Sequence, residues 1–143
     1  MAAIIEVSDL CISFIDFSEK GVMALKNISL EIHEGEFVCI VGPSGCGKTT
    51  LLHTIAGLNP YFPPDRGQIL LEGQKVKGPG AERGVVFQEY AILPWRNVKA
   101  NIEFGLKLQG VPPPERAKRS QYYIDLIGLQ EFREKFPHQL SGG

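Results

Sequence analysis

One stretch decides the fold of this chain: Gly42-Pro43-Ser44-Gly45-Cys46-Gly47-Lys48-Thr49-Thr50. A glycine, four residues and then Gly-Lys-Thr is the spacing of a loop that wraps phosphate groups. Because glycine lacks a Cβ, the backbone N–H groups of such a loop can turn toward an anion without obstruction. The sequence therefore predicts a nucleotide site over residues 42–50 in which all nine residues take part.

Two side chains of this loop have distinct expected tasks. Lys48 is expected to reach back over the phosphates, and Thr49 to offer its hydroxyl to Mg²⁺. A helix that starts near Lys48 would add unsatisfied N–H groups and the positive end of its dipole. For Cys46 we expect use of the backbone N–H alone; the alternative is a thiol whose pKa is lowered by the helix and Lys48.

The residues around the loop have the patterns that a phosphate loop requires. The apolar run 36–41 before it predicts a central strand covered on both faces. After it, Leu51, Leu52, Ile55 and Leu58 recur at helical spacing, and Gly57 is expected to end that helix. This strand, loop and helix order disfavours a glycine-rich turn that binds nothing.

Further strands are predicted on both sides of the loop. Residues 3–10 alternate apolar and polar side chains and predict an edge strand that continues loosely to Phe14, and residues 26–33 predict its antiparallel neighbour. Residues 68–72 and 74–76 flank Gly73 as a short hairpin. Residues 83–88 predict a second covered strand, with Gln88 at the strand end where open α/β sheets place ligand chemistry.

The last third of the chain has helical patterns. Asn97 is a plausible N-cap for a helix that runs to about Leu108. A second helix is predicted after the prolines at 112–114, ending near Gly128. Its expected core face is Ala117, Tyr123, Ile124 and Ile127.

Composition limits the class of protein. The chain has 143 residues, a formal charge of -1 and 43% hydrophobic residues, which suits one globular domain or part of one. It has no apolar run long enough to cross a bilayer, so membrane association is expected only through a partner. The near-neutral charge argues against nucleic acid as a partner. Three cysteines without CxxC spacing make a metal site unlikely and fit a reducing compartment.

Three elements coincide in a way that resembles one family: the phosphate loop, a strand ending in Gln88, and the tetrad Leu140-Ser141-Gly142-Gly143. Together they resemble the ATPase subunit of an ATP-binding-cassette (ABC) transporter, and the resemblance covers the whole chain. The stretch 78–88, followed by Leu93-Pro94-Trp95, resembles importers of nitrate, taurine and other sulfonates, and is closest to the taurine type.

The resemblance implies an α/β fold with a phosphate-loop core. Residues 1–35 would form an antiparallel β subdomain, residues 36–96 the core up to the Gln88 loop, and residues 97–143 a helical subdomain ending in the signature. It also implies ATP and Mg²⁺ as ligands, with Gln88 sensing Mg²⁺ and the attacking water. Phe14 would stack on adenine, with Phe17 as the alternate; the other reading of Phe14 is core packing.

The resemblance also implies partners. Ser141, Gly142 and Gly143 would contact the γ-phosphate held by a second ATPase subunit in a head-to-tail dimer. Trp95 would lie near an integral membrane permease; the alternative is simple burial. A periplasmic substrate-binding protein would take part indirectly. The expected location is peripheral, on the cytoplasmic face of the bacterial inner membrane.

The family places an apolar strand ending in Asp-Glu, and later a histidine, after the signature. These 143 residues stop first, so we expect an N-terminal fragment that holds a nucleotide but does not hydrolyse it competently. The alternatives are a non-transport ABC-type ATPase and an inactive nucleotide-binding fragment. A phosphate-loop kinase or GTPase is disfavoured because no Asn-Lys-x-Asp motif is present.

Overall fold

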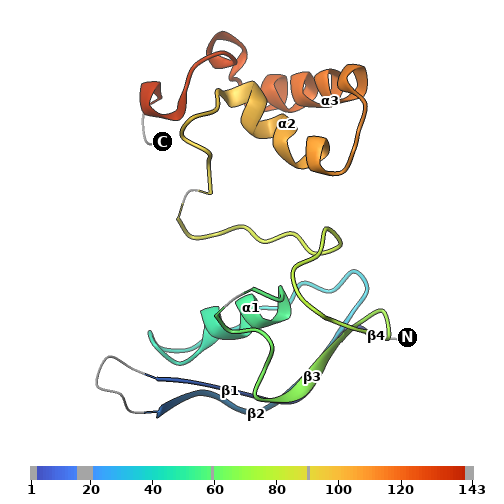
Figure 1. The fold of residues 1–143 in the computed structure, drawn as a ribbon, viewed down its shortest axis with the longest axis vertical. Helices are drawn as coiled ribbons and strands as arrows, with labels where there is room; N and C mark the ends of the chain where they lie inside the picture. Colours follow the sequence, from blue (N-terminus) through green and yellow to red (C-terminus); the bar gives the residue numbers. More distant parts are fainter. Residues whose placement is uncertain (1–2, 16–20, 59, 90, 141–143) are drawn as a thin grey trace. The chain divides into compact units, whose positions relative to one another are not determined.

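The computed structural model describes residues 3–15, 21–58, 60–89 and 91–140. The chain divides into two compact units, Met1–Val85 and Val86–Gly143. Each unit is described by itself (Figure 1). Among the described residues, no helix is both long and apolar enough to span a bilayer.

The first unit contains a four-stranded antiparallel sheet in the order β2-β1-β3-β4. Its strands are β1 (Ala3–Ile15), β2 (Gly21–His33), β3 (Arg66–Leu71) and β4 (Gln74–Lys75). The predicted edge position of the first strand is wrong, because Val7 of β1 pairs with Leu30 of β2 on one side and Ile69 of β3 on the other. Alternating polarity reports which face is buried; it does not report how many neighbours a strand has.

The predicted hairpin around Gly73 is confirmed. β3 and β4 are joined by Glu72 and Gly73, both with positive φ, +48° and +73°. Two consecutive positive φ values are the geometry of the tight turn whose twist matches antiparallel strands. Gly73 adopts this geometry without the steric cost that a side chain would add.

The helix after the loop is α1 (Lys48–Ile55), and it lies over the sheet (Figure 1). Its Leu51 joins a buried cluster with residues from three strands and the segment after β4: Val7, Leu10, Ile12, Leu25, Ile69 and Val76. The helix ends before Gly57, as predicted, where φ is +75° and a Cβ would lie 2.3 Å from the carbonyl oxygen of Gly78.

The two covered strands predicted at 36–41 and 83–88 are absent from the described structure. Both runs are irregular, and Phe37 and Val86 are 93% and 100% exposed. A covered strand needs paired neighbours and layers on both faces. The described residues provide no β-partner for either run, so an apolar sequence alone does not make them strands.

The second unit contains two packed helices, α2 (Val98–Leu108) and α3 (Pro113–Leu126), and short 3-10 turns at Gln130–Phe132 and Pro137–Gln139. The Asn97 cap is confirmed, because its Oδ1 accepts a hydrogen bond of 2.8 Å from the Ala100 N–H.

The predicted core face of α3 is wrong at three of its four positions. Ile124 is only 1% exposed, whereas Ala117, Tyr123 and Ile127 are exposed. A helix that packs against a single partner buries only a narrow strip of its surface, and helical spacing does not say how wide that strip is.

Candidate functional site

The phosphate loop leads directly into α1. Gly45 and Gly47 have φ values of +80° and +94°, a left-handed conformation that side chains disfavour. Gly47 is the N-cap of α1, and no side chain caps the helix. Within the described part of the chain, the N–H groups of Gly45, Gly47 and Lys48 have no acceptor. A row of free donors at a helix N-terminus is suited to an anion.

The Lys48 side chain folds back over the loop. Its Nζ donates hydrogen bonds of 2.8 Å to the Gly42 carbonyl and 2.6 Å to the Pro43 carbonyl, and it lies 3.6 Å from Cys46 Sγ. In the structure the ammonium lies on the carbonyl side of the loop, and the predicted contact of Lys48 with the phosphates stays a prediction. The loop therefore brings a cation together with unpaired N–H donors.

Two glycines of the loop lie where a side chain would collide. A Cβ on Gly42 would lie 2.7 Å from Cys46 Sγ, and a Cβ on Gly47 would lie 2.7 Å from the Ala24 carbonyl oxygen. The loop therefore rests directly against the backbone of β2. The thiol of Cys46 packs against Gly42, and its backbone N–H donates a 3.4 Å hydrogen bond to the Pro43 carbonyl, so the expected use of this N–H by a nucleotide stays a prediction.

The threonines of α1 differ in exposure. Thr49 is exposed, so its hydroxyl is free to approach a ligand, whereas Thr50 is buried. Thr54 Oγ1 donates a 2.7 Å hydrogen bond to the Thr50 carbonyl. The nucleotide contact predicted for Thr50 stays a prediction, as does the role of exposed Ser44.

Phe14 lies near the end of β1, opposite Val22 of β2. Ile12, two residues before Phe14 in β1, pairs with Leu25 of β2. The residue before Leu25 is Ala24, and Gly47 lies against its carbonyl oxygen. Phe14 therefore lies opposite the same part of β2 against which the phosphate loop packs. Phe14 is 43% exposed, so the core-packing alternative is wrong. The alternate residue, Phe17, lies outside the described residues.

One residue that holds this end of β1 has no recognisable signal in the sequence. Asp65 accepts hydrogen bonds from both the backbone N–H and the hydroxyl of Ser13, the residue before Phe14. The two residues are 52 positions apart, and neither belongs to a recognisable motif.

The remaining predicted site residues belong to the second unit. Gln88 is exposed in an irregular segment, and Trp95 is 70% exposed, so simple burial of Trp95 is wrong. Ser141, Gly142 and Gly143 lie outside the described residues. The structure therefore leaves the roles of these residues as predictions.

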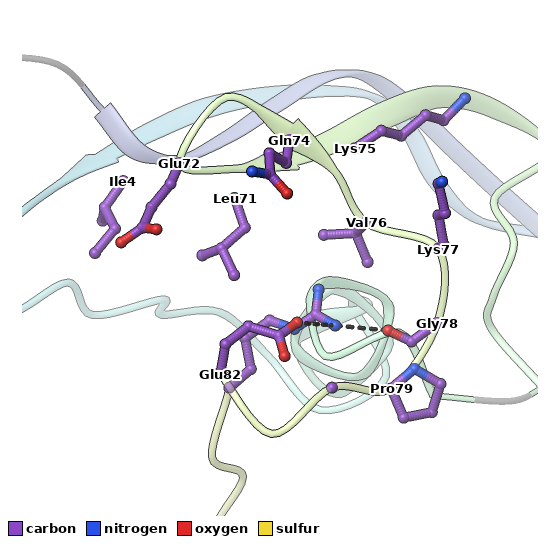
Figure 2. Close-up of a pocket in the computed structure, with 12 residues that line it drawn as sticks. Ile4, Leu71, Glu72, Gln74, Lys75, Val76, Lys77, Gly78, Pro79 and Glu82 are labelled. Carbon is purple, nitrogen blue, oxygen red and sulfur yellow. Dashed lines mark hydrogen bonds and ion pairs between the residues drawn. The ribbon is translucent and has the colours of Figure 1, made fainter.

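A cavity of about 570 Å³ lies elsewhere in the first unit, between the β3–β4 hairpin and the loop around Gly78 (Figure 2). In it Arg83 Nη2 donates a 2.5 Å hydrogen bond to the Gly78 carbonyl and lies 3.0 Å from Glu82 Oε1. No residue of the phosphate loop lines this cavity. Arg83 therefore fastens its own loop, and the cavity is separate from the candidate nucleotide site.

No group of three or more His, Cys, Asp or Glu side chains that could hold a metal is found in the described ranges. The exposed Thr49 hydroxyl offers a single oxygen ligand for a metal ion. Such a ligand suits Mg²⁺, which keeps several waters and is bound largely through phosphate oxygens.

Comparison with known proteins identifies a family. The model of the family described as "ABC transporter" matches residues 25–143. An uncharacterized ABC transporter ATP-binding protein of Methanocaldococcus jannaschii is 53% identical over 90% of this chain and 47% of its own length. The nitrate import ATP-binding protein of Synechocystis is 51% identical over 97% of this chain and 51% of its own.

Taurine import proteins are also similar. That of Shigella boydii is 47% identical over 86% of this chain and 47% of its own length. The chain thus spans about half the length of these curated relatives. Among solved structures, the ATP-binding cassette MJ0796, a dimer bound to ADP and Pi, matches with a TM-score of 0.80 and 30% identity, over 96% of this chain and 63% of that one.

Proposed function

This chain belongs to the ABC transporter family, and we propose that it is the phosphate-binding part of an importer's ATP-binding subunit. The fold is that of the ABC ATPase cassette. In the proposal, ATP hydrolysis by the complete subunit drives uptake of a small anion such as taurine, an alkanesulfonate or nitrate. The names of the nitrate and taurine import relatives support this substrate class.

One observation carries the proposal: Lys48 and the free N–H groups of Gly45 and Gly47 converge on the N-terminus of α1. We propose that the backbone of residues 42–47 surrounds the β- and γ-phosphates of ATP. Lys48 then exchanges its carbonyl partners for phosphate oxygens, which is favourable because a charge-assisted hydrogen bond is stronger than one to a neutral carbonyl.

The metal and hydrolysis roles follow from the family resemblance. Thr49 is proposed as a ligand of Mg²⁺, with Gln88 at the metal and the attacking water, and Thr50 on the α-phosphate side. Bound Mg²⁺ would neutralise charge on the phosphates. Phe14 is proposed as the adenine platform because it is exposed and its backbone pairs with β2 close to the Ala24 carbonyl, against which the loop lies.

The proposed partners are three. Ser141, Gly142 and Gly143 would complete the ATP site of a second copy, as the dimeric cassette structure supports for that relative. Trp95 would lie against the permease, which fits its exposure. A periplasmic binding protein would deliver the anion. These partners would hold the subunit at the cytoplasmic face of the inner membrane.

Nucleotide-dependent thermal stabilisation tests the proposal. We expect ATP with Mg²⁺ to raise the melting temperature, and GTP to do so less effectively. Stabilisation by GTP alone would favour a GTPase or kinase, and stabilisation by neither would refute the nucleotide site. These 143 residues are expected to bind ATP without competent turnover, whereas binding without turnover by the complete subunit would favour the alternative of an inactive nucleotide-binding protein.

The transported anion requires a separate measurement. Titration of the proposed periplasmic binding protein with taurine, an alkanesulfonate and nitrate would identify it. Binding of none of the three would contradict the proposed substrate class.

Association with ribosomes or nucleic acid in place of a permease would favour a non-transport cassette ATPase.

A further inference from the structure

Asp65 and Ser13 form a tight polar contact at the end of the sheet. One carboxylate oxygen, Asp65 Oδ2, lies 2.5 Å from the Ser13 backbone nitrogen and 2.6 Å from Ser13 Oγ. In return the Asp65 N–H donates a 3.1 Å hydrogen bond to the Cys11 carbonyl. The residue before β3 is thus fastened to β1 at two points.

The contact between Asp65 and Ser13 lies just beyond the point where β1 stops pairing with β3. The pairing of β1 with β3 ends at Cys11 and Arg66, so the Ser13 N–H has no strand opposite it there. An unpaired backbone donor at the end of a strand favours fraying. The Asp65 carboxylate takes the place of the missing strand and satisfies this donor.

Phe14 is the residue immediately beyond this contact. It pairs with Val22 on the β2 side, and Ile15 and Gly21 form the last pair of the ladder. Phe14, Ile15 and Val22 are all exposed, so side-chain packing does little to hold this end of β1. The backbone that carries the Phe14 ring is therefore held mainly by β2 and by Asp65 through Ser13.

We propose that Asp65 is a positioning residue for nucleobase binding: its carboxylate fixes Ser13 so that the Phe14 ring is presented as a stacking platform for adenine. This inference rests on the proposed function. An aromatic ring that is already held in place loses less conformational entropy when a base stacks on it. Hydrogen bonds to a carboxylate are stronger than those between neutral groups, so one side chain suffices.

The proposal separates base binding from phosphate binding. ATP and inorganic tripolyphosphate both engage the phosphate loop, but only ATP has a base to stack. In the full chain, Asp65→Ala should weaken ATP affinity about three- to tenfold, within the range of base–aromatic stacking, and leave tripolyphosphate affinity unchanged. Phe14→Ala should do the same. The double variant should bind ATP no more weakly than Phe14→Ala alone, because Asp65 acts through that ring.

Isothermal titration with both ligands measures these affinities. Asp65→Asn keeps an acceptor oxygen for Ser13 and should recover most of the ATP affinity. Glu31→Ala removes an exposed carboxylate from β2 of the same sheet and should leave both affinities unchanged.

Each contrary outcome has a distinct meaning. Equal loss of ATP and tripolyphosphate affinity in Asp65→Ala would show a general structural role and overturn the proposal. Unchanged ATP affinity, or an additive loss in the double variant, would overturn it as well. If the unmodified protein binds neither ligand, the phosphate-loop assignment itself fails, which is a different result from the failure of Asp65 alone.

Discussion

The ammonium of Lys48 lies 2.6 Å from the carbonyl oxygen of Pro43, so the only lysine of the phosphate loop is bonded to the loop's own backbone. Lys48→Ala removes the cation that would move to the phosphates. A ligand at one hundred times its Kd stabilises a protein by about 2.7 kcal/mol. We expect Lys48→Ala to lose most of this stabilisation in a thermal-shift titration with ATP.

The matched control is Lys99→Ala, which removes a lysine of α2 that lies 3.9 Å from Glu103. It should keep the full ATP-dependent stabilisation. Equal ATP-dependent stabilisation of Lys48→Ala and the unmodified protein would contradict the assignment of residues 42–50 as the phosphate site.

A compensating pair tests the packing inside the loop. The added Cβ of Gly42→Ala would lie 2.7 Å from Cys46 Sγ but 4.0 Å from Cys46 Cβ. Gly42→Ala should therefore weaken ATP binding about tenfold or more, because the loop must shift. Adding Cys46→Ala removes the sulfur and should restore most of the affinity. Cys46→Ala alone should bind ATP normally, and failure of the double variant to recover would show that Gly42 is needed for another reason.

Local signals predicted the parts of this fold that depend on near neighbours in sequence. The Asn97 cap, the start of α1 after Gly47 and the turn at Gly73 each depend on hydrogen bonds or φ values within a few residues. Such features are encoded by residue type at one position, so a single sequence is enough to place them.

Features that depend on distant partners were not predictable. The runs 36–41 and 83–88 have the composition of covered strands, but a strand forms only where another strand pairs with it. Alternating polarity predicts an edge position for β1, and this fails because the pairing of β1 with β3 joins residues about 60 positions apart, which no local pattern reports. The contact between Asp65 and Ser13 is of the same kind, since no pattern links an aspartate in a loop to a serine 52 residues away.

Asn101 holds the turn that carries Trp95. Its Oδ1 accepts a 2.8 Å hydrogen bond from the Leu93 N–H, and its Nδ2 donates to the carbonyls of Leu93, Arg96 and Asn97. The Leu93 and Asn97 carbonyls also accept backbone hydrogen bonds, but the Leu93 N–H and the Arg96 carbonyl are paired through this side chain. Asn101→Ala removes the partner of these two part-buried groups and should cost about 2 kcal/mol in urea unfolding. The Leu93 amide should also exchange faster with solvent. Gln109→Ala, at an exposed position just after α2, should change neither quantity.

A surface ion pair on α3 has a defined pH response. The pKa of Glu115 is lowered by the hydrogen bond from Arg119, whose Nε lies 2.7 Å from Glu115 Oε1, and by the charge of that guanidinium. Because the folded-state pKa is depressed, the contribution to stability is present above the pKa of Glu115 in the unfolded chain and disappears as the pH falls through the folded value.

Arg119→Ala should therefore raise the pKa of Glu115 toward its ordinary value, as measured by NMR titration of the carboxyl carbon. Arg133→Ala removes an arginine that pairs with Glu134 instead, and should leave the Glu115 titration unchanged. A Glu115 titration that is the same in Arg119→Ala and in the unmodified protein would contradict the ion pair.

Alanine substitutions at Gly45 and Gly47 test whether the phosphate loop packs against the backbone of β2. Both have left-handed φ values, +80° and +94°, so an alanine at either position carries a similar backbone strain of about 1–2 kcal/mol. Only at Gly47 does the new Cβ collide with backbone, 2.7 Å from the Ala24 carbonyl oxygen, whereas nothing lies within 4 Å at Gly45. Gly47→Ala should therefore lower the free energy of unfolding in urea by at least about 1 kcal/mol more than Gly45→Ala. Equal losses would mean that the loop does not rest on Ala24, because backbone strain alone would then explain both variants.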